Sequence, residues 1–103
     1  MNGIEMIEAE RERQVEVEGW TAKHDDTHRS GNLLWAAACY VQEAASAADT
    51  GCGDCPVPGF APEEWPWDAA WWKPCDDQRR NLAKAGALIA AEIDRLNRIA
   101  GDV

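Results

Sequence analysis

The sequence predicts a small all-α protein, a three-helix bundle in which a Trp/Pro-rich ordered flap lies between the second and third helices. Apolar residues recur at helical spacing in three separate stretches, and no segment alternates apolar and polar residues over the length of a strand. All five prolines fall between Pro56 and Pro74, so they separate the second stretch from the third. A chain of 103 residues is expected to form one domain around a modest core, which gives a single helical domain over residues 1–103.

The first predicted helix covers residues 4–18, where Ile4, Ile7 and Val15 form a narrow apolar stripe on an otherwise charged surface. Gly19 is suited to end this helix, because glycine readily adopts the left-handed conformation that follows a helix C-terminus. Trp20 comes directly after it and is expected to fold back onto the helix.

The second predicted helix is rich in alanine and runs from Leu33 to about Ala48, with Ser30 as its candidate N-cap. Its small side chains allow neighbouring helices to approach closely, which suits the centre of a bundle. The segment Asp49-Thr50-Gly51 is expected to end it.

The third predicted helix starts after an N-cap at Asp76 or Asp77 and ends at Gly101. Apolar residues recur along it at helical spacing: Leu82, Ala85, Leu88, Ile89, Ile93, Leu96 and Ile99. Gly86 in the middle of a helix costs about 1 kcal/mol relative to alanine. We therefore expect Gly86 to mark a close crossing with the Ala-rich second helix.

The connection between these two helices divides into two parts. Prolines and glycines exclude a continuous helix or strand from residues 51–75. The same segment holds four tryptophans, and a disordered linker would be poor in aromatic residues. We therefore expect a mobile loop over residues 51–62 and an ordered flap from Trp65 to Pro74, packed on the bundle.

Charge and cysteine content exclude several classes of function. Ten basic against nineteen acidic residues give a net charge of −9, which disfavours DNA, RNA or an anionic membrane as a partner. The chain has no leading apolar segment and no apolar run of about eighteen residues, so we expect a cytoplasmic protein with reduced thiols. Cys52-Gly53-Asp54-Cys55 is a C-x-x-C, which by itself is a weak signal for a metal or redox site.

The strongest concentration of titratable groups is His24-Asp25-Asp26-Thr27-His28. In a helix the two imidazoles share one face, and Asp25 lies at its edge. Such a cluster can bind a divalent metal, relay a proton or hold a polar ligand. A metal is the less favoured use, because no third or fourth strong ligand is evident nearby. The competing interpretation is a solvated turn in which Asp25 or Asp26 caps a helix.

Basic side chains gather in two further places. Arg11 and Arg13 either form ion pairs within the acidic first helix or, together with Gln14, bind an anion beside the histidines. Arg79, Arg80 and Lys84 lie at the start of the third helix, where the helix dipole disfavours cations. Their compensating partner is either the pair Asp76 and Asp77 or a ligand phosphate.

The chain resembles a family of short, mostly uncharacterised phage and prophage proteins. The resemblance rests on Glu10-Arg11-x-Arg13-Gln14, Glu18-Gly19-Trp20-Thr21 and the His24–His28 cluster, and it continues through Trp72-Lys73-Pro74 and the segment from Arg79 to Ile89. It covers most of the chain outside residues 49–62. Asn32 departs from the pattern, since an acidic residue is expected after the glycine.

Together, these features predict a small phage-type binding protein that sequesters a nucleotide-derived defence signal in the host cytoplasm without turning it over. Its small size is compatible with a homo-oligomer that has pockets at its interfaces. The predicted ligand-binding residues are Arg11, Arg13, Gln14, Trp20, His24, Asp25, His28, Trp72, Arg79, Arg80 and Lys84. No cofactor is required, although the cluster allows a divalent metal. The alternatives are a metal-dependent nucleotide hydrolase that uses the His/Asp cluster and an acidic inhibitor of a host protein.

Overall fold

The computed structural model describes residues 1–27, 31–50 and 61–101, with residues 49 and 50 described through their backbone alone. It contains the helices α1 (Gly3–Glu16), α2 (Ala22–Asp26), α3 (Asn32–Thr50) and α4 (Gln78–Ile99), and the short 3₁₀ helix η1 (Ala69–Trp71). These ranges contain no strand, so the predicted all-α class is confirmed. Most of the predicted mobile loop, residues 51–60, lies outside the described residues. The same is true of Ser30, the predicted N-cap of the second helix.

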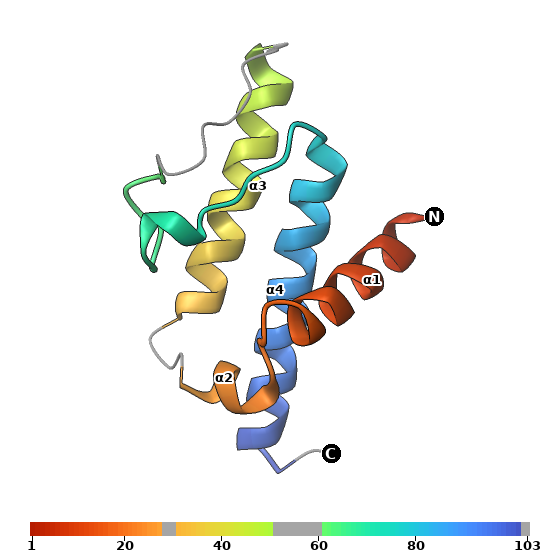
Figure 1. Ribbon diagram of the computed structural model, residues 1–103, viewed down its shortest axis with the longest axis vertical. Coiled ribbons are helices and arrows are strands. Elements are labelled where there is room, and N and C mark those ends of the chain that lie inside the picture. The colour runs from red at the N-terminus through yellow and green to blue at the C-terminus, as the bar shows by residue number, and fades with distance from the viewer. Residues whose placement is uncertain (28–30, 51–60, 102–103) are drawn as a thin grey trace.

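Helices α3 and α4 run antiparallel, side by side, and form the centre of the molecule (Figure 1). Helix α1 packs across α4, and the short α2 lies against the C-terminal half of α4. The guanidinium of Arg98 holds α2 in this position, because it donates to the Asp26 carboxylate at 2.8 Å and to the Ala22 carbonyl at 3.3 Å. The hydrogen bond to Asp26 raises the pKa of Arg98.

Local signals in the sequence account for most helix ends. Asn2 and Glu5 form a reciprocal capping box at the start of α1, with N–H to oxygen distances of 2.8 and 2.9 Å. Asp77 caps α4, as one of the two predicted alternatives. Helix α1 ends at Glu16, two residues earlier than predicted, and Gly19 adopts a φ of +75° in the turn that follows.

Alanine and aromatic side chains build the core between α3, α4 and the tryptophan segment of residues 61–77. Tyr40 of α3 lies at the centre, with its ring centroid 4.8 Å from that of Trp72 and 5.8 Å from that of Trp65. Leu33 and Leu88 add the largest aliphatic side chains. Cys39 is buried beside them, and burial raises the pKa of its thiol.

The crossing at Gly86 differs from the prediction. A Cβ atom built at Gly86 would lie 2.7 Å from Cδ1 of Ile7, so the close approach is to α1 and not to the Ala-rich α3. The predicted partner is therefore wrong. Helix α4 has neighbours on two sides, and the side that faces α3 is lined by Ala85 and Leu88 instead.

Candidate functional site

A cleft lies between the end of α1, helix α2 and the tryptophan segment. It has a volume of about 520 Å³ and is lined by Glu18, Trp20, His24, Thr27, Trp67, Asp68 and Trp71. The turn at Gly19 reverses the chain direction, so that Trp20 N–H donates to the Gln14 carbonyl at 2.9 Å. This turn places Glu18 and Trp20 in one wall of the cleft. We call this hollow the aromatic cleft.

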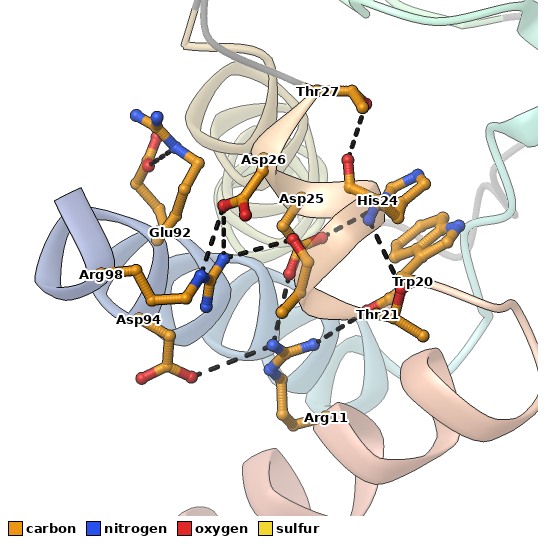
Figure 2. A network of polar contacts seen from close by, with 12 residues as sticks. Arg11, Trp20, Thr21, His24, Asp25, Asp26, Thr27, Glu92, Asp94 and Arg98 are labelled. Carbon is orange, nitrogen blue, oxygen red and sulfur yellow. Dashed lines mark hydrogen bonds and ion pairs between the residues drawn. The ribbon is translucent and has the colours of Figure 1, made fainter. Parts of the chain in front are cut away.

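Trp20 and His24 form the α2 side of the aromatic cleft. Thr21 caps α2 by accepting a hydrogen bond from the His24 N–H, and one turn of helix then places the imidazole on the indole. The two rings are stacked, with centroids 5.7 Å apart and planes 5° from parallel. Figure 2 shows the His24 ring lying over Trp20.

The tryptophan segment forms the opposite wall. Trp67 lies 5.5 Å from Trp20 at an interplanar angle of 57°, and Trp71 is 45% exposed at the mouth of the cleft. Asp68 fixes the backbone between them, because its carboxylate accepts from Ala70 N–H at 2.8 Å and its carbonyl accepts from the Trp65 indole at 3.1 Å. The two rings are therefore held on an irregular segment by hydrogen bonds to one residue.

A narrow polar recess continues from the aromatic cleft, with which it shares Glu18, Trp20 and Trp71. Its volume is about 20 Å³, room for about one water molecule or one polar group of a ligand. The remaining lining residues are Glu10, Arg13, Gln14, Tyr40, Lys73 and Lys84.

Charges in the recess are paired with one another. Arg13 donates to Glu10 at 2.6 and 2.9 Å and to Glu18 at 3.0 Å, and these hydrogen bonds raise the pKa of the guanidinium. Lys84 donates to the Lys73 carbonyl at 2.5 Å, and Lys73 N–H donates to the Tyr40 hydroxyl at 3.4 Å. The recess is thus held in a fixed shape before any ligand enters.

Gln14 differs from its neighbours in the recess. Its side chain is buried, and its Oε1 atom accepts no hydrogen bond from the described residues. A buried amide oxygen without a donor costs about 1–3 kcal/mol, so a donor brought by a ligand would recover that free energy. The recess can therefore select a ligand that carries an N–H or O–H group at its tip.

Behind the aromatic cleft, Arg11 and the buried Asp25 form a partly buried ion pair that orients His24. Asp25 is 1% exposed; its Oδ2 accepts from Arg11 at 3.3 Å, and its Oδ1 lies 3.1 Å from His24 Nδ1. Arg11 also donates to the Trp20 carbonyl at 3.4 Å and lies 3.9 Å from Asp94 of α4 (Figure 2). The pair fixes both residues of the stacked wall from beneath.

The structure brings some of the predicted site residues together and places others elsewhere. Arg13, Gln14, Trp20, His24 and Lys84 line the aromatic cleft or the recess. Arg11 and Asp25 lie one layer behind them. Trp72 is in the core, Arg79 pairs with Asp77 on the surface at 2.8 Å, and Arg80 borders a separate hollow between α1 and α4. His28 lies outside the described residues.

Several lining residues were not selected from the sequence as ligand-binding residues: Glu10, Glu18, Tyr40, Asp68 and Lys73. Sequence spacing gave one usable signal, since Glu10 lies three residues before Arg13 on the same helix face. The others depend on where the irregular tryptophan segment lies.

Within residues 1–27, 31–50 and 61–101, no group of three or more His, Cys, Asp or Glu side chains is arranged to hold a metal ion. Three candidate ligands from the sequence, His28, Cys52 and Cys55, lie outside these ranges.

The chain matches no protein-family model, no curated protein and no solved structure. Among the helices that the structure describes, none combines the length and the hydropathy needed to cross a bilayer. The fold and the geometry of the aromatic cleft therefore provide the physical basis for a functional proposal.

Proposed function

We propose that this chain is a small binding protein that holds a nucleotide-like ligand in the aromatic cleft without turning it over. The observation that carries the proposal is a cleft of about 520 Å³ with three tryptophans that leads into a charged recess. Small-molecule sites typically measure about 300–1,000 Å³ and combine apolar walls with a few placed polar groups. A planar heteroaromatic ring suits the apolar walls, and one polar group attached to it suits the recess, while an attached anionic group can stay at the mouth.

The ring would lie against the indoles. Stacking of a base on an aromatic side chain contributes about 1–3 kcal/mol and tolerates different bases, because every base has a π face. Trp67 and Trp71 offer such surfaces, and Trp20 is held in place by its stacking with His24. The carboxylates of Glu18 and Asp68 are placed to accept from exocyclic amino groups of the ring.

Lys73 is the cation best placed for the anionic group. Its side chain is 55% exposed, its Nζ lies 5.1 Å from the centroid of the Trp71 ring, and its nearest carboxylate is Glu18 at 3.7 Å. Arg13 and Lys84 lie deeper and are engaged with Glu10, Glu18 and a backbone carbonyl. A phosphate at the mouth would therefore meet Lys73, while Gln14 accepts from the group that reaches the recess.

Binding without turnover is favoured by the state of the two carboxylates in the recess. Glu10 and Glu18 both accept hydrogen bonds from Arg13, which occupies lone pairs that a general base would use to activate water. The resemblance to phage proteins suggests the biological setting: a nucleotide-derived defence signal held in the cytoplasm of an infected or lysogenic host. Metal-dependent hydrolysis and inhibition of a host protein remain the competing proposals.

The test is a thermal-shift screen followed by calorimetry on the full chain. The ligands are nucleoside mono- and diphosphates and cyclic dinucleotides, with and without Mg²⁺ or Zn²⁺. Matched nucleosides and ribose 5-phosphate serve as controls that each carry one half of the ligand. Compounds with both ring and phosphate should raise the Tm and be recovered intact by chromatography.

Two variants assign the binding to the aromatic cleft. Trp67→Leu and Lys73→Gln should each weaken binding by about tenfold or more, through lost stacking and lost phosphate contact respectively. Their matched controls are Trp35→Leu and Lys23→Gln, which are exposed on α3 and α2 and should bind like the parent. Recovery of a cleaved product would establish an enzyme, and no stabilisation by any compound would reject the nucleotide proposal.

A further inference from the structure

An apolar surface on α3 and α4 is left uncovered by the rest of the described chain. Six branched side chains are each 42% to 53% exposed: Leu34 and Val41 on α3, and Leu82, Ile89, Ile93 and Leu96 on α4. None of the six is among the described residues that line the aromatic cleft or the recess. Isolated exposed apolar residues are normal, whereas a contiguous group marks an interaction site.

These residues belong to two rows with the same spacing. On α3 the row is Leu34, Ala38, Val41, Ala45 and Ala48, and on α4 it is Leu82, Gly86, Ile89, Ile93 and Leu96. Both rows advance by alternate steps of four and three residues, the spacing with which helices pack along one another in coiled coils and four-helix bundles. Neither row contains a charged residue, although the chain has 10 basic and 19 acidic residues.

Both rows lie on the same face of the α3–α4 pair. At about 100° per residue, Leu34 and Val41 are about 100–120° around α3 from Tyr40, which faces the tryptophan segment. Leu82 and Ile89 are about 140–160° around α4 from Lys84, which also faces that segment through its bond to Lys73. The buried residues that join the two helices lie in between: Ala37 and Ala44 on α3, and Ala85 and Leu88 on α4.

The direction of rotation completes the geometry. On both helices the rotation from the tryptophan segment to the row passes through the α3–α4 contact and has the same sense about the chain direction. Because α3 and α4 are antiparallel, these two rotations end on the same outer face of the pair. The two rows therefore emerge side by side, opposite the tryptophan segment. Ile7 of α1 rests on Gly86 at the border of this face, and Leu82 and Ile89 on either side of it stay exposed.

We propose that this face binds a second copy of the chain, and that α3 and α4 of two protomers form a two-fold symmetric four-helix bundle. The rows are self-complementary, because large side chains dominate the α4 row and alanines dominate the α3 row. A two-fold axis can then set the α4 row of one protomer on the α3 row of the other, with large residues above small ones.

Charge and size favour the same partner. A chain with a net charge of −9 repels its own copy, and a charge-free face is the surface through which two copies meet at the lowest electrostatic cost. Helices of 19 and 22 residues give a face about 30 Å long and about 20 Å wide. That area, about 600 Å² in projection, approaches the roughly 800 Å² that each partner buries in a stable interface.

A lipid surface fits this face less well. Helices that lie on membranes flank their apolar side with lysine and arginine, which bind anionic headgroups. Helix α3 has neither residue anywhere between Leu33 and Ala48. The partner most consistent with both rows is therefore helical, apolar and uncharged along its contact surface, as the second copy is.

The test is sedimentation equilibrium of the full chain over a wide concentration range. The parent should have twice the mass of one chain. Ile93→Glu places a charge at the centre of the α4 row and should give a monomer with the helical circular dichroism retained, because Ile93 is exposed in a single protomer. Trp35→Glu is the matched control, since Trp35 is equally exposed on α3 but outside the row, and it should remain a dimer.

A smaller substitution at Ile93 and a lipid-binding assay complete the experiment. Ile93→Ala keeps helix propensity and should raise the dissociation constant of the dimer by about tenfold or more. A parent that stays monomeric throughout, an Ile93→Glu variant that still dimerises, or a monomeric parent that binds neutral phosphatidylcholine vesicles would each overturn the proposal. Ligand binding in the aromatic cleft is measured separately and lies on the opposite face, so the two proposals fail independently.

Discussion

The two faces of the α3–α4 pair differ in what covers them. One face carries the tryptophan segment, the recess with its paired charges and the aromatic cleft. The other carries exposed leucine, isoleucine and valine and no charge along its rows. In a monomeric bundle these aliphatic residues would be expected to form the core. Here alanines and aromatic side chains form most of the core, with Leu33 and Leu88, and the aliphatic residues of the two rows stay exposed.

The aromatic residues repeat this division on a smaller scale. Trp65 and Trp72 are buried against Tyr40 and add aromatic bulk to a core that otherwise consists of alanines, Leu33 and Leu88. Trp71 and Trp67 belong to the same segment but line the aromatic cleft. The stretch from Trp65 to Trp72 therefore both closes the core and lines the aromatic cleft, so its two roles can be separated by substituting single rings.

Trp72→Ala should have the largest effect. Trp72 is 2% exposed, and truncation of a buried aromatic residue lowers the free energy of unfolding by about 3–5 kcal/mol. Trp71→Ala, one position earlier and 45% exposed, should cost less than about 1 kcal/mol. Urea denaturation followed by circular dichroism measures both. Equal losses in the two variants would contradict the division between core and cleft rings.

Asp25→Asn should cause the second-largest loss in the free energy of unfolding. The substitution keeps the shape of the side chain but removes the charge that Arg11 and His24 contact. Since Arg11 is one-fifth exposed, solvent screens part of the loss, and we expect about 2 kcal/mol in the free energy of unfolding. A double-mutant cycle with Arg11→Met isolates the pair, and a coupling energy near zero would show that Asp25 does not depend on Arg11.

Sequence patterns predicted the parts of the fold that depend on local chemistry. The three long helices and the cap at Asp77 follow from apolar spacing and from side chains that accept backbone N–H groups. Helix α2 has five residues, too few for a period to be visible. The partner of Gly86 was mispredicted because a glycine marks a close approach without saying which neighbour makes it.

The candidate site was predictable only where its contacts are local in the sequence. His24 and Asp25 are adjacent in sequence, so their contact required no knowledge of the fold. The pairing of Arg11 with Asp25 depends on the turn at Gly19 and on the angle between α1 and α2. Composition alone does not tell a core tryptophan from a cleft tryptophan, because the distinction is set by the path of an irregular segment held by Asp68.

Gly86→Ala tests the border between α1 and the exposed face. The new methyl group would lie 2.7 Å from Cδ1 and 2.8 Å from Cγ1 of Ile7, so Ile7 must move. Crowding then outweighs the gain in helix propensity, and the variant should lose about 1 kcal/mol. In an Ile7→Ala background the same substitution should instead stabilise by up to about 1 kcal/mol. The same sign in both backgrounds would contradict the contact.

The ionisation of Tyr40 should have the smallest effect at neutral pH, where the hydroxyl stays protonated and stability does not change with pH. Burial raises the pKa of its hydroxyl to about 12, above the usual value of 10. Because the folded protein binds this proton more tightly, its contribution to stability is fully present below pH 10 and is lost as the pH rises towards 12, at up to about 1.4 kcal/mol per pH unit. Tyr40 is the one tyrosine in the chain, so absorbance at 295 nm reports it directly. A midpoint near 10 while the helical circular dichroism persists would show that the tryptophan segment leaves this hydroxyl open to water, and Tyr40→Phe supplies the baseline.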